Sequence, residues 1–151
     1  MNIAIIGTLD TKGSEVGFIC ETILKLGHTP LVIDPGVLGS SSLQANVTRQ
    51  EIAQAGGESL DSLIARKDKA HAQSVMIQGL VNIVTRLYAE GRFAGIVAVG
   101  GAQGTAMATA AMRALPVGVP KLDNGFANET DLTAFGVERA DDGNVHGAPH
   151  C

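Results

Sequence analysis

The chain has 151 residues, of which 45% are hydrophobic and 17% charged; this composition is typical of a globular protein and excludes a largely disordered one. Its net charge is −4, since residues 1–122 carry 10 basic and 9 acidic side chains, whereas residues 123–151 carry 1 basic and 6 acidic ones. Neither part offers the basic surface that duplex DNA binding needs, and a chain with no tryptophan and one tyrosine is a poor platform for stacking single-stranded bases.

The expected location of the protein is the cytoplasm. The N-terminal segment 1–7 lacks the basic region and long apolar stretch of a signal peptide, and no apolar run reaches the length of a membrane span. The two cysteines, Cys20 and Cys151, lie far apart and do not indicate a disulfide framework. We therefore expect no membrane partner and no nucleic-acid partner.

The first half of the chain alternates between predicted strands and helices. The apolar run 3–6 is a predicted strand, the polar residues 7–13 a turn, and residues 14–26 a helix with an apolar face. A second strand over 30–34 ends on Asp34, and a loop rich in glycine and serine covers 35–46. Thr48 and Glu51 have the spacing of a capping box, which predicts a short helix that stops at Gly56.

The second half continues this alternation. Helical periodicity extends over about 60–90 with a break near Lys67, followed by a strand over 95–99, a glycine-rich turn, a helix over 106–115 and a fourth strand over 117–122. The pattern predicts a three-layer α/β fold, Rossmann-like or flavodoxin-like, with a mainly parallel sheet of about four strands. Residues 1–122 form the predicted domain, and residues 123–151 a weakly structured acidic tail.

Both glycine-rich turns and Asp34 follow predicted strands directly. In a parallel sheet the carboxyl ends of the strands share one edge, and ligands bind beyond that edge. The segment 100–105 combines glycines with a threonine hydroxyl ahead of a helix, which suits an anion such as phosphate; the alternative is a simple tight turn. The predicted contacts there are Gly100, Gly101, Gly104 and Thr105.

The turn at residues 7–13 is richer in polar groups. Thr8, Thr11 and Lys12 could contact phosphate oxygens beside Gly7, whereas Asp10 could hold a metal ion or a ribose hydroxyl, or cap the following helix.

Asp34 could accept from a ribose hydroxyl or form the turn before Pro35. Lys121 is expected at the same edge of the sheet, or else as a surface lysine. His146, His150 and Cys151 lack the scaffold of a metal site, so no metal ligands are predicted.

Three segments together resemble one known family. They are 5–12 (Ile-Ile-Gly-Thr-Leu-Asp-Thr-Lys), 33–39 (Ile-Asp-Pro-Gly-Val-Leu-Gly) and 99–121, which begins Val-Gly-Gly-Ala-Gln-Gly-Thr. Residues 1–122 resemble the start of the N-terminal region of the tomato mosaic virus resistance protein-like family, which has bacterial and fungal relatives. The resemblance implies ATP binding by two α/β subdomains, of which this chain holds the first. After Leu122 the chain departs from the family pattern, and the missing subdomain would leave surface that favours a homo-oligomer.

The leading functional hypothesis is thus an ATP-binding module that binds the nucleotide either alone or together with Mg²⁺. One alternative is a Mg²⁺-dependent hydrolase or transferase acting on a phosphate ester, for which no general base is identifiable. The other is an interaction or remnant domain that binds no ligand tightly.

Overall fold

The computed structural model describes residues 1–39 and 41–123. Its elements, in chain order, are β1 (Asn2–Gly7), α1 (Leu9–Lys25), β2 (Thr29–Ile33), α2 (Arg49–Ala55), α3 (Leu60–Arg66), α4 (Lys69–Ala89), β3 (Gly95–Val99), α5 (Ala102–Ala114) and β4 (Lys121–Asp123). Apart from Asp123, the last residue of β4, the predicted tail 123–151 lies outside the described residues. None of the helices in the described part of the chain has the length and apolarity needed to cross a membrane.

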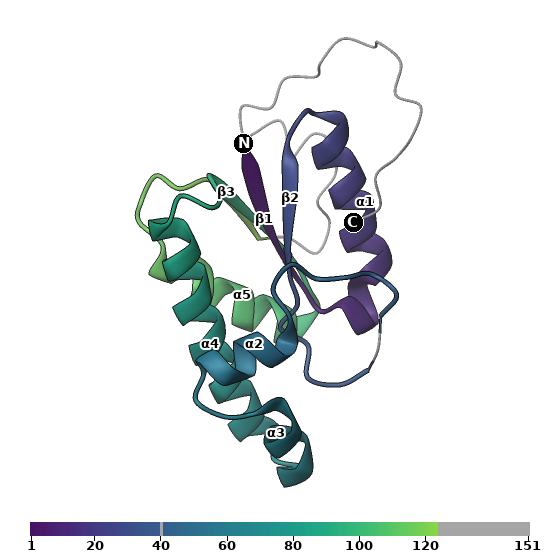
Figure 1. The fold of residues 1–151 in the computed structure, drawn as a ribbon, viewed down its shortest axis with the longest axis vertical. Helices are drawn as coiled ribbons and strands as arrows, with labels where there is room; N and C mark the ends of the chain where they lie inside the picture. The colour runs from purple at the N-terminus through teal and green to yellow at the C-terminus, as the bar shows by residue number, and fades with distance from the viewer. Residues whose placement is uncertain (40, 124–151) are drawn as a thin grey trace.

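The strands form one parallel sheet in the order β2-β1-β3-β4, which confirms the predicted α/β fold. Helix α1 packs on one face of the sheet through a cluster that includes Val16, Ile19 and Ile23. Helices α2, α4 and α5 lie on the other face, with Met76 and Leu80 of α4 fully buried there (Figure 1). The arrangement is three-layered and doubly wound, and the strand order follows the flavodoxin-like pattern.

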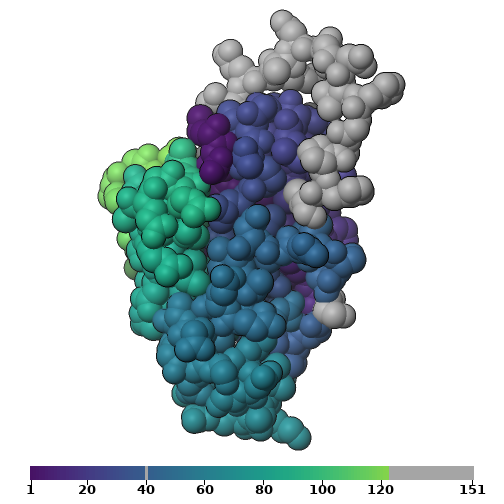
Figure 2. All heavy atoms as spheres, in the orientation of Figure 1, coloured from purple at the N-terminus to yellow at the C-terminus, as the bar shows by residue number. Residues whose placement is uncertain are grey.

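Helices α2 and α4 cross closely because one glycine lies within α4 and another lies at the C-terminal end of α2. A Cβ atom added to Gly79 of α4 would lie 1.8 Å from the carbonyl oxygen of Ile52 in α2. A Cβ atom added to Gly56, the C-cap of α2, would lie 2.2 Å from the carbonyl oxygen of Val75. In Figure 2 the segment from α2 to the start of α4, coloured blue to teal, forms the lower part of the surface.

The structure corrects three predicted boundaries. Helix α1 begins at Leu9 rather than near residue 14, with a non-helical backbone only at Lys12, and α5 begins at Ala102 rather than 106. Each helix starts almost at once because Gly7 and Gly100 let the backbone turn where a side chain would collide: a Cβ on Gly100 would lie 2.8 Å from the Cα of Gly104. Strand β4 begins at Lys121 rather than Val117.

The capping box at the start of α2 is confirmed. The Thr48 hydroxyl accepts from the Glu51 N–H, and the Glu51 carboxylate accepts from the Thr48 N–H at 2.8 Å. The Thr48 hydroxyl also donates to this carboxylate, at 2.9 Å. The two hydrogen bonds that the carboxylate accepts, from the Thr48 N–H first and from the Thr48 hydroxyl second, hold the pKa of Glu51 below its ordinary value of 4.5.

Acidification should therefore weaken the start of α2. A carboxyl group whose pKa is lowered by folding stabilises the folded state above its ordinary pKa of 4.5, and this contribution is lost as the pH falls through the lower, folded value. We expect Glu51→Gln to lower the free energy of unfolding at pH 7. The difference in this free energy between the variant and wild type should be smaller at pH 3. Urea unfolding at both pH values measures the difference, and the same difference at both would contradict the assignment.

Candidate functional site

The carboxyl edge of the sheet contains a topological switch point between β1 and β3. From β1 the chain crosses through α1 to β2 on one side, whereas β3 lies on the other side of β1. Gly7 pairs with Val99 in the register of β1 and β3, so the residues that follow, Thr8 and Gly100, leave neighbouring strands at the same level. The structure thus brings the two predicted loops side by side at the position where doubly wound folds bind ligands.

The loop between β3 and α5 leaves the start of α5 open. Gly101 is the N-cap and makes no side-chain cap hydrogen bond, and the first turn of α5 contains no acidic residue. Gly101, Ala102 and Gln103 are exposed, whereas Gly104 is buried against the turn. Thr105 donates its N–H to the Gly101 carbonyl at 2.9 Å and its hydroxyl to the Gly100 carbonyl at 3.4 Å. The first N–H groups of a helix and its positive dipole end favour an anion at this point.

Thr8 and the first residues of α1 hold the other predicted contacts. The hydroxyl oxygens of Thr8 and Thr11 lie 3.0 Å apart, and Lys12 Nζ lies 2.7 Å from a carboxylate oxygen of Glu15. The hydrogen bond from Lys12 is the main cause that lowers the pKa of Glu15 from its ordinary value. Asp10 is exposed in the first turn of α1.

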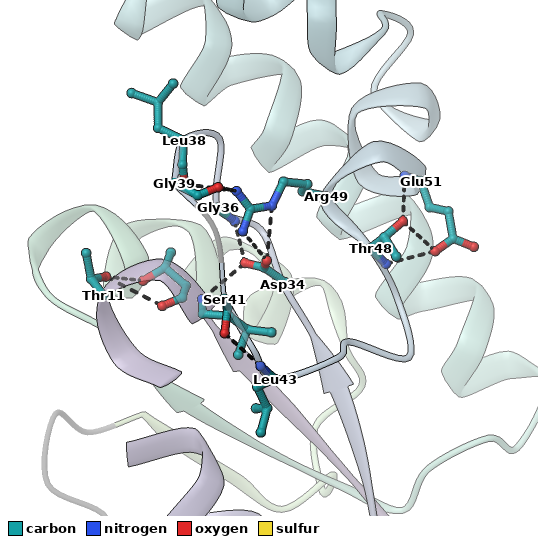
Figure 3. Close-up of polar contacts among 12 residues, drawn as sticks. Thr11, Asp34, Gly36, Leu38, Gly39, Ser41, Leu43, Thr48, Arg49 and Glu51 are labelled. Atoms are coloured by element: carbon teal, nitrogen blue, oxygen red, sulfur yellow. Dashed lines mark hydrogen bonds and ion pairs between the residues drawn. The ribbon is translucent and has the colours of Figure 1, made fainter. Parts of the chain in front are cut away.

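Asp34, just after β2, joins three elements through a nearly buried carboxylate (Figure 3). Its Oδ1 accepts from the N–H groups of Leu9 at 3.2 Å and Gly36 at 2.9 Å. Its Oδ2 accepts from Arg49 Nε at 3.1 Å and Nη2 at 2.7 Å, a two-pronged ion pair with side chains only 5% and 12% exposed. The carboxylate thus ties the start of α1 to the loop after β2 and to the start of α2.

The loop after β2 also lies over the first turn of α1. Gly39 has a φ of +80°, and a Cβ atom there would lie 2.6 Å from the Cβ of Asp10. A Cβ on Gly36 would lie 2.9 Å from Asp34 Oδ1 and 3.5 Å from Asp10 Oδ1. Two carboxylates of the chain itself therefore stand at the positive end of α1, whereas no acidic side chain belongs to the first turn of α5. The two glycine-rich loops are electrostatically unequal.

The structure differs from the sequence-based expectations at two residues. Lys121 lies at the start of β4, not its end, so it is at the opposite edge of the sheet, where its Nζ donates to the carbonyls of Pro116 at 2.8 Å and Leu115 at 3.4 Å. Arg49 was missed altogether. The sequence places Arg49 just after the capping-box threonine, but its approach to Asp34 depends on the pairing of Val47 with Ile33 at the end of β2, which only the tertiary structure shows.

Comparison with known proteins places the chain in a family. The model of the N-terminal domain of the uncharacterised protein family UPF0261 matches residues 1–123. The chain belongs to this family. Within the described residues of this UPF0261 domain, no group of three or more His, Cys, Asp or Glu side chains stands together as a metal site would require.

The relatives are longer than this UPF0261 chain. A UPF0261 protein of Clostridium tetani is 48% identical over 120 residues, which are 80% of this chain and 30% of the relative. A UPF0261 protein of Brucella suis is 34% identical over 119 residues, 79% of this chain and 28% of the relative. The ToMV susceptible protein tm-1(GCR26) of Solanum lycopersicum is 24% identical over 132 residues, 78% of this chain and 18% of that protein. The resemblance to the tomato protein is therefore distant, and the chain spans under a third of these relatives.

Proposed function

We propose that this domain binds the phosphate groups of a nucleotide, with ATP as the leading ligand, at the carboxyl edge between β1 and β3. The observation that carries the proposal is the open N-terminus of α5 at the switch point, beside Thr8, whose hydroxyl lies 3.0 Å from that of Thr11. Helix N-termini at such points supply N–H donors and a positive dipole end to phosphate. ATP stands first among phosphate ligands because the three motif segments resemble the tomato mosaic virus resistance protein-like family, a resemblance that implies ATP binding.

The charge distribution supports phosphate binding on the α5 side. At the start of α1, the Asp34 carboxylate already accepts from the Leu9 N–H, and Asp10 adds a second negative charge. A phosphate there would meet like charge, whereas the start of α5 presents its N–H groups without an acidic neighbour in the first turn.

Lys12 can join this site at small cost. Its ion pair with Glu15 is exposed, with side chains 31% and 44% accessible, and exposed pairs contribute only about 0–1 kcal/mol. The Lys12 ammonium group can therefore leave Glu15 for a phosphate oxygen. Asp10, exposed in the first turn of α1, is the residue that would hold a Mg²⁺ ion accompanying the nucleotide.

The experiment is thermal unfolding of the protein with ATP, ADP, tripolyphosphate and inorganic phosphate, each with and without Mg²⁺. A ligand at about a hundred times its Kd adds roughly 2.7 kcal/mol, which raises the Tm by several degrees in a chain of this size. We expect ATP to raise the Tm. If no phosphate compound shifts a cooperative transition, the domain is not a phosphate binder.

A negative charge introduced at the start of α5 tests the location of the site. Gly101→Asp should abolish the ATP-induced shift or weaken ATP binding more than tenfold, because its carboxylate competes with phosphate for the same N–H groups. The fold should tolerate it: a Cβ on Gly101 meets nothing within 4 Å, and aspartate is a preferred N-cap residue. Gly101→Ala is the matched neutral control. Equal ATP binding by the two variants would place the phosphates elsewhere.

A further inference from the structure

The loop that follows β2 is held in place by a side chain that the phosphate site does not use. Arg49 Nη1 donates to the carbonyl oxygens of Leu38 and Gly39, both at 2.9 Å, while the rest of its guanidinium group binds Asp34. The Gly36 N–H is fixed by the same carboxylate. The backbone on both sides of Leu38 is thereby tied to two nearly buried charged groups, and this loop has a defined shape without a ligand.

This fixed loop presents an apolar side chain to solvent. Leu38 is 60% exposed, whereas Val37 beside it packs partly against the core. In Figure 3 the Leu38 side chain extends away from Asp34 and Arg49. The exposure is therefore not the fraying of a loose loop, because the carbonyl of Leu38 itself is one of the two that Arg49 holds. A fixed, exposed leucine is suited to contact an apolar surface of a ligand.

The position of the loop relative to α5 indicates which part of a ligand it could meet. Strand order places β2 and β3 on opposite sides of β1, so the ends of β2 and β3 are two strand spacings apart, about 10 Å. Loop 35–39 follows β2 and lies over the first turn of α1, and the start of α5 follows β3. A ligand that reaches from α5 to Leu38 must be extended, with an anionic end and an apolar end, as a nucleotide is.

We propose that Leu38 contacts the base of the bound nucleotide, and that Arg49 is the positioning residue that holds Leu38 in place. This inference rests on the proposed phosphate site at α5. It assigns the selectivity for a nucleotide over a plain polyphosphate to the loop after β2, which no phosphate need touch. Tripolyphosphate carries the same anionic end without a base, so it reports on the phosphate site alone.

The test compares the Kd of ATP and of tripolyphosphate by calorimetry for wild type, Leu38→Ser and Val117→Ser. Val117 is the matched control, because it is fully exposed but lies in the turn before β4, at the opposite edge of the sheet. We expect Leu38→Ser to weaken ATP binding about five- to tenfold and to leave tripolyphosphate binding unchanged, and Val117→Ser to change neither.

A second variant tests the positioning role of Arg49. Arg49→Lys keeps the positive charge but cannot bind the Asp34 carboxylate and two carbonyls together. The ratio of ATP affinity to tripolyphosphate affinity should fall, a readout that a general loss of stability would not move. If both ligands bind wild type and neither variant changes this ratio, the inference is wrong and the phosphate site stands. If wild type binds neither ligand, the proposed function is wrong and the inference falls with it.

Discussion

Replacing Asp34 by alanine should lower the free energy of unfolding by about 3 to 5 kcal/mol in the absence of any ligand. The substitution leaves the Arg49 guanidinium group, only 12% exposed, without its carboxylate, and it removes the acceptor of the Leu9 and Gly36 N–H groups. Removing one partner of a buried pair is expensive because the other charge stays desolvated. Chemical denaturation of the ligand-free protein measures the loss.

Two controls separate this effect from a general loss of negative charge. Asp61→Ala removes an exposed carboxylate from the first turn of α3 and should lower stability by only about 0.3–1 kcal/mol. The double variant Asp34→Ala with Arg49→Ala should lose less than the sum of the single losses, since the two residues share one interaction. If Asp34→Ala left the unfolding free energy almost unchanged but weakened ATP binding, Asp34 would be a ligand contact rather than a structural tie.

Gly79→Ala should destabilise the protein by about 3 kcal/mol, which corresponds to a fall in Tm of roughly 10 °C. The added methyl group would lie 1.8 Å from the Ile52 carbonyl oxygen, so α2 and α4 must move apart and give up packing between them. Alanine gains about 1 kcal/mol in helix propensity, but this gain cannot offset a collision with backbone. Thermal and urea unfolding report the difference.

Gly17→Ala is the matched control for this prediction. Gly17 is also inside a helix, α1, but a Cβ atom there meets nothing within 4 Å. That substitution should stabilise the protein by about 0.5–1 kcal/mol, because only the propensity term remains. Similar changes at the two positions would show that α2 and α4 do not cross as closely as the structure places them.

Much of the fold was predictable because its determinants are local. The apolar run at 3–6 and the run at 95–99 identified β1 and β3, and alternation with helices indicated a parallel sheet. The capping box at Thr48 and Glu51 was also predictable, because its hydrogen bonds join residues three apart. The predicted starts of α1 and α5 were too late. Their glycine-rich polar segments have the composition of turns, but most residues of these segments already belong to the first turns of the two helices.

The arrangement of the candidate site depended on contacts between distant residues. The sequence by itself determined that both glycine-rich loops and Asp34 follow strands, and hence that they share an edge of a parallel sheet. Only the tertiary structure decided that Arg49 pairs with Asp34, that Lys121 lies at the opposite edge, and that the start of α1 is lined by carboxylates while that of α5 is open. Local patterns do not show which side chains distant in sequence a fold brings within hydrogen-bonding distance, because strand order and register set those distances.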